Sequence, residues 1–138
     1  METGRNDEND RRGVSSASSL DAIDILVLLV LAACGWGLWV WADSQTDAEA
    51  WDHNSFWSVV LPAIAVLSAV AGWLRPSAAV WVGLALVVPQ AITLFATSGI
   101  GPLAIVGLLF FAVFAGGFTA IARIAARVRI EWAAAKRS

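Results

Sequence analysis

Residues 76–122 read PSAAVWVGLALVVPQAITLFATSGIGPLAIVGLLFFAVFAGGFTAIA and contain no Asp, Glu, Lys or Arg. As a single helix, this uncharged run would be about 70 Å long, more than twice the ~30 Å hydrocarbon core of a bilayer. The run must therefore form two membrane spans. Residues 98–102, SGIGP, separate them, because two glycines and a proline end one helix and favour the start of the next. We expect these spans at about residues 77–97 and 102–122.

Two further apolar stretches precede this run. They cover about residues 20–42 and 54–74, and each is long enough to cross a bilayer. The chain of 138 residues is 59% apolar and only 14% charged, more apolar surface than a soluble domain of this size can bury. The predicted fold class is therefore all-α: a polytopic integral membrane protein in which residues 20–122 form four transmembrane helices joined by short loops.

The two ends of the chain differ from this core in composition. Residues 1–19 are rich in Ser, Asn, Asp and Arg and have no periodic apolar face, which predicts a disordered tail. Residues 123–138 are helical in composition and strongly basic, which predicts a helical extension of the last span beyond the membrane.

The distribution of charge predicts the orientation. All nine Lys and Arg residues lie before the first span, between the second and third, or after the fourth, whereas the other side carries the acidic segment 43–53 and no basic residue. By the positive-inside rule, both termini are cytoplasmic and the protein lies in the cell membrane. Tryptophan, which prefers the headgroup boundary, agrees with this topology. The expected outer group is Trp36, Trp39, Trp41, Trp51 and Trp57, and the inner group is Trp73, Trp81 and Trp132.

Asp21 and Asp24 occupy the first turns of the first span and share one helical face. One interpretation is a proton or cation site within the membrane. The other, which we favour, is helix capping, with Ser18 and Asp21 forming a capping box and both carboxylates complementing the helix dipole.

The third span carries a polar stripe. Gln90, Thr93 and Thr97 recur at helical spacing just after Pro89, which frees the carbonyl of Ala85 from its intrahelical hydrogen bond. A substrate or ion path could use this stripe, so it is the candidate intramembrane site. The alternative, which we favour, is that the proline kinks the helix and the polar side chains bond neighbouring helices.

The fourth span separates its residues by size. One face carries four aromatic rings: Phe110, Phe111, Phe114 and Phe118. The opposite face is small: Ala112, Ala115, Gly116, Thr119 and Ala120. Because small residues let helix backbones approach closely in lipid, we expect the small face to pack against other helices. We expect the phenylalanines to meet lipid or, alternatively, a partner protein.

Five cations follow the fourth span: Arg123, Arg127, Arg129, Lys136 and Arg137. Basic residues next to a membrane attract the anionic lipids of the cytoplasmic leaflet. We therefore expect these residues to contact anionic lipid. The alternative is that they only set orientation and stay solvated, or dock on an acidic surface of a partner.

The sequence offers little material for enzymatic chemistry. It has no Gly-rich phosphate loop, and His53 is its only histidine. The acidic loop ending at His53 matches no calcium or zinc pattern, so a solvated turn is expected there. Cys34 ends the lipoprotein-like stretch LAAC, but Asp21 and Asp24 upstream and the apolar run downstream favour an ordinary cysteine within a span. We expect neither a metal nor a cofactor.

These observations favour a non-catalytic accessory, scaffold or regulatory subunit of a larger membrane complex. The alternatives are a small oligomeric transporter or channel and a holin-like protein that disrupts membranes. The leading interpretation rests on the scarcity of ionisable groups within the spans, because conduits usually need them. The net charge of −2 argues against nucleic acid as a partner.

The topology can be tested with reporter fusions. Reporters placed after Arg75 and at the C-terminus are expected to show cytoplasmic activity, because both sites lie on the basic side, and a reporter near Glu49 is expected to be external. Paired phosphatase and green fluorescent protein fusions measure the two sides. An external C-terminus would contradict the four-span prediction.

Overall fold

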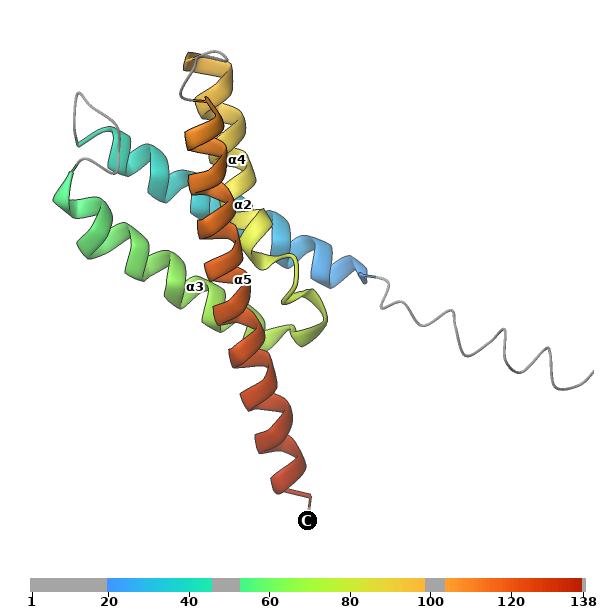
Figure 1. Ribbon diagram of the computed structural model, residues 1–138. Coiled ribbons are helices and arrows are strands. Elements are labelled where there is room, and N and C mark those ends of the chain that lie inside the picture. The colour runs from blue at the N-terminus through green and yellow to red at the C-terminus, as the bar shows by residue number, and fades with distance from the viewer. Residues whose placement is uncertain (1–19, 46–52, 99–103, 138) are drawn as a thin grey trace, which may run out of the picture.

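The computed structural model describes residues 20–45, 53–98 and 104–137. Within these ranges the chain is helical and contains no strand, so the all-α prediction is confirmed (Figure 1). The elements are α2 (Ala22–Asp43), a π-helical turn η2 (Phe56–Val60), α3 (Leu61–Leu74), a 3-10 turn η3 (Pro76–Ala78), α4 (Val82–Ser98) and α5 (Ala104–Ala135).

Three helical segments are long and apolar enough to cross a membrane: Ala22–Asp43, Phe56–Leu74 and Ile105–Ala135. The fourth apolar helix, α4, has 17 residues and is shorter. Each helix covers one of the apolar stretches in the sequence, and α5 continues beyond its stretch into the basic segment, to Ala135. The expected disordered tail, most of the acidic loop and the glycine–proline break after Ser98 lie outside the described residues.

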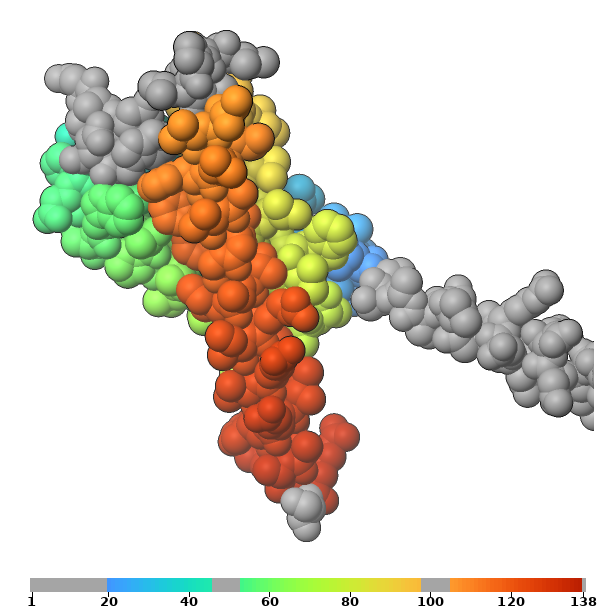
Figure 2. Space-filling view, viewed as in Figure 1, coloured from blue at the N-terminus to red at the C-terminus, as the bar shows by residue number. Residues whose placement is uncertain are grey.

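The helices pack as crossed pairs. α5 packs against both α3 and α4, and α4 packs against α2, whereas α2 and α3 make few contacts with each other. Figure 1 shows α4 and α5 running across the directions of α2 and α3. The last turns of α5 extend well beyond the other described helices, as the space-filling view also shows (Figure 2).

Glycines bring the helix backbones into direct contact. A Cβ atom at Gly72 of α3 would overlap the backbone carbonyl of Ala122 in α5, and one at Gly83 of α4 would overlap that of Ala115. At Gly35 of α2, an added Cβ would lie 2.9 Å from the carbonyl oxygen of Leu86 in α4. Helices associate in lipid through such close packing, because lipid tails provide no hydrophobic drive between them.

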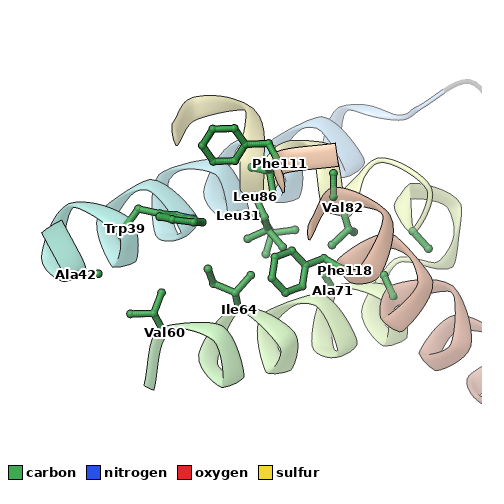
Figure 3. Packing of buried hydrophobic residues seen from close by; sticks show 14 of the residues in the cluster. Leu31, Trp39, Ala42, Val60, Ile64, Ala71, Val82, Leu86, Phe111 and Phe118 are labelled. Atoms are coloured by element: carbon green, nitrogen blue, oxygen red, sulfur yellow. The ribbon is translucent and has the colours of Figure 1, made fainter. Parts of the chain in front are cut away.

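An aromatic cluster fills the space between α2, η2 and the first half of α5. Trp39 is 1% exposed, and its ring centroid lies 4.8 Å from that of Phe56 and 6.0 Å from that of Phe111. Figure 3 shows Trp39 and Phe111 among the buried hydrophobic residues. Since α2 and α3 make few contacts, large rings are needed to occupy the gap between them. Trp39 therefore packs against other elements of the chain, and its position near a membrane boundary stays a prediction. The other described tryptophans are exposed: Trp36, Trp41, Trp57, Trp73, Trp81 and Trp132.

The same gap determines which face of α5 turns inward. Phe111 and Phe118 are each 4% exposed and belong to the core, so the expectation that the phenylalanine face meets lipid is wrong for these two residues. The small face is divided. Ala115 and Thr119 lie against Gly83 of α4. Its remaining members are exposed: Ala112, Gly116 and Ala120.

Replacing Gly83 by alanine is expected to lower the free energy of unfolding by about 1–3 kcal/mol, because α4 and α5 must separate to admit the methyl group. Thermal denaturation in a mild detergent measures the loss. Gly117→Ala is the matched control, because a Cβ at Gly117 meets nothing within 4 Å. Equal stability of the two variants would contradict the contact.

Candidate functional site

The start of α2 is closed by a reciprocal capping box. Asp21 is the N-cap residue, and its Oδ1 accepts a hydrogen bond of 2.7 Å from the backbone N–H of Asp24. In return, the backbone N–H of Asp21 donates to Oδ2 of Asp24 over 3.4 Å. The predicted box between Ser18 and Asp21 is wrong, because the helix begins at Ala22 and the box lies three residues further along. Ser18 itself lies outside the described residues.

Arg75, which follows α3, binds both carboxylates of this box. Its Nη2 lies 2.5 Å from Oδ2 of Asp21, and its Nε donates to Oδ1 of Asp24 over 2.6 Å. The hydroxyl of Ser77, in η3, lies 3.0 and 2.9 Å from the two carboxylate oxygens of Asp24. The connection between α3 and α4 is therefore tied to the start of α2 by one charge-assisted network.

Asp24 is the buried centre of this network. The residue is 1% exposed, whereas the side chains of Asp21 and Arg75 are 56% and 26% exposed. A buried carboxylate is costly unless it is paired and hydrogen-bonded, and Asp24 has both kinds of partner. The pKa of Arg75 is raised above its usual value by its hydrogen bonds to Asp24 and Asp21.

This geometry favours a structural clamp over a cation site. A cation at Asp24 would have to displace the Arg75 guanidinium and the Ser77 hydroxyl, both of which contact its carboxylate. Within the described ranges, no group of three or more His, Cys, Asp or Glu side chains is arranged to hold a metal ion.

The three residues of the predicted polar stripe of α4 have different environments. Gln90 is 4% exposed, and its Oε1 is buried without a hydrogen-bond partner in the described chain. Thr93 donates to the carbonyl of Pro89 over 2.9 Å and accepts from Nε1 of Trp36 in α2 over 3.1 Å. Thr97 is exposed and donates to the carbonyl of Thr93. Thr93 thus makes the interhelical bond that the stripe predicted, whereas Thr97 bonds within its own helix.

An apolar groove lies beside the proline of this stripe, between α2 and α4. Its lining is formed by Ile25, Leu28, Leu29, Ala32, Ala85, Val88 and Pro89. The groove offers van der Waals contact to a lipid chain or an apolar side chain, and its lining side chains provide no charged group.

The basic extension of α5 is also attached to α3. Nη1 of Arg129 donates to the carbonyl oxygens of Trp73 and Leu74, each over 2.6 Å, and thereby satisfies the end of α3. The ring of Trp132 lies 6.2 Å from that of Trp73, and the Nζ of Lys136 lies 3.6 Å from the Trp132 ring centroid. Arg129 and Lys136 therefore have partners within the chain.

Three other residues of the expected lipid contact, Arg123, Arg127 and Arg137, are exposed. Sequence reasoning missed the bonds of Arg75 to the two aspartates and of Arg129 to α3. One signal was present, because the charge distribution predicts that Arg75, alone in its short loop, lies on the same side of the membrane as Asp21 and Asp24.

No protein-family model, curated protein or solved structure matches this chain.

Replacing Arg75 by glutamine leaves Asp24 buried without its counter-charge. The expected loss is about 2 kcal/mol in the free energy of unfolding, below the ~3–5 kcal/mol of fully buried pairs because the Arg75 side chain is 26% exposed. Chemical denaturation in detergent measures it, with Arg127→Gln as the control for losing one exposed arginine. The double variant D24N/R75Q is expected to recover most of the loss. A loss no larger than that of Arg127→Gln, or no recovery, would contradict the clamp.

Proposed function

We propose that this protein is a four-span, non-catalytic accessory, scaffold or regulatory subunit of a larger complex in the cell membrane, with both termini in the cytoplasm. In this proposal, α4 is the third span. The basic residues Arg75 and Arg129 then lie on the cytoplasmic side, together with the start of α2 and the end of α5.

The contacts of Asp24 with Arg75 and Ser77 are the main support for this proposal. A carboxylate near the start of the first span is the feature of the sequence that suggests a proton or cation path. In such a path, the carboxylate must be free to bind and release the proton or cation. Asp24 is instead held by Arg75 at 2.6 Å and by the hydroxyl of Ser77. These contacts support a fixed structural role for the most buried ionisable group described.

The exposed part of the small face supports a protein partner. Ala112, Gly116 and Ala120 recur every four residues on α5 and point away from the core. A Cβ at Gly116 meets nothing within 4 Å, so another helix has room to approach this backbone.

A small oligomeric transporter or channel is the second candidate. The observation that favours it is the buried Oε1 of Gln90, which has no hydrogen-bond partner in the described chain. Such an oxygen can accept a hydrogen bond from a substrate or contact a cation.

Extraction of the tagged protein in a mild detergent, followed by mass spectrometric identification of what is retained, tests the proposal. A stoichiometric membrane-protein partner is expected. Gly116→Leu is expected to release this partner, because it fills the exposed small face. Gly37→Leu is the matched control, since Gly37 is also an exposed helical glycine with open space around it, but on α2.

Two outcomes would contradict the subunit proposal. A homo-oligomer that moves a solute across vesicle membranes would favour the transporter. Leakage and death of cells on expression would favour the membrane-disrupting alternative.

A further inference from the structure

We propose that Arg123 and Arg127 bind the phosphate of an anionic phospholipid at the membrane boundary, and that Ile124 and Val128 contact its acyl chain. The lipid surface is thus assigned to one face of α5. The inference uses the proposed topology but does not depend on a protein partner.

Two parallel rows of side chains form this face. Arg123 and Arg127 are one helical turn apart, and so are Ile124 and Val128 beside them. Both arginines are exposed and have no hydrogen-bond or ion-pair partner in the described chain. Ile124 and Val128 are 62% and 50% exposed. A cationic row beside an exposed apolar row matches a molecule that joins a phosphate to a hydrocarbon chain.

Contacts with α3 place these rows at the right depth. Ala122, just before Arg123, packs on Gly72, two residues before the end of α3. Arg129, just after Val128, reaches the carbonyls of Trp73 and Leu74. The two rows therefore lie between two contacts with the last residues of α3, where the apolar helix gives way to Arg75. Arginine at this depth can extend its charge to the headgroups while its stem stays in apolar surroundings.

The charge and polarity of this face of α5 favour an anionic phospholipid over an acidic protein surface as its ligand. Phosphate is well matched to arginine, whose planar guanidinium donates several hydrogen bonds. An acidic protein surface would pair with the arginines but would leave the apolar row uncovered or require an apolar patch at the same spacing. Glu131 follows one turn after Arg127 and limits the cationic surface on that side. Arg129 is directed at α3 and Lys136 at Trp132, so we exclude both from this surface.

The test uses the full-length protein in detergent with an equimolar mixture of phosphatidylglycerol and phosphatidylcholine, and native mass spectrometry counts the retained lipids. The wild type is expected to retain phosphatidylglycerol preferentially. The double variant R123Q/R127Q is expected to lower this preference about tenfold, because two cations near the headgroups are lost. The charge-conserving variant R123K/R127K is expected to keep most of it.

Arg129→Gln is the matched control, because it removes one arginine from the same helix but from the face that contacts α3. It is expected to lower the stability of the protein and to keep the lipid preference. Equal retention of the two lipids by the wild type would overturn the proposal and favour an acidic protein surface as the partner. A larger loss of preference in R129Q than in R123Q/R127Q would also overturn it.

Discussion

The direct contact between the backbones of α5 and its two neighbours is the constraint on which the rest of the structure depends. Gly72 and Gly83 have no side chain at the points where α3 and α4 meet α5. Helices in lipid gain little by burying apolar side chains from a solvent that is equally apolar, so close packing has to hold them together. With α5 fixed at these two points, Phe111 and Phe114 pack against Trp39 of α2, and Arg129 comes within reach of the last carbonyls of α3.

α2 is attached to α3, α4 and α5 by different kinds of contact at its two ends. Near its C-terminal end, Trp39 packs its ring on Phe56 and Phe111, a contact that depends on shape and area. At its N-terminal end, Asp24 is held by Arg75 and Ser77, a contact that depends on charge and hydrogen-bond geometry. Between them, Gly35 rests on the backbone of Leu86. The two kinds of contact respond differently to change: aromatic packing tolerates small shifts, whereas a buried carboxylate does not tolerate the loss of its partner.

The positions of the helices were predictable from the sequence, but their inward faces were not. Uncharged runs bounded by charges or glycine locate each helix because the bilayer imposes a length. In a soluble protein, the polar face of a helix would also reveal its orientation, but both the exposed and the buried faces of these helices are apolar. For that reason Phe111 and Phe118 were assigned to lipid although they are buried in the core. The contact between Asp24 and Arg75 joins residues 51 positions apart, and no local pattern encodes such a pair.

The order in which the chain is synthesised determines when the bond between Asp24 and Arg75 can form. A ribosome produces Asp24 51 residues before Arg75, so in the proposed topology α2 would enter the membrane while the carboxylate of Asp24 has no counter-charge. During that interval Asp24 is stable only in contact with water or headgroups. In that topology, Asp24 would reach its buried, paired position only after α3 had brought Arg75 to the same side. The ion pair between Asp24 and Arg75 thus makes the final position of the start of α2 depend on the end of α3.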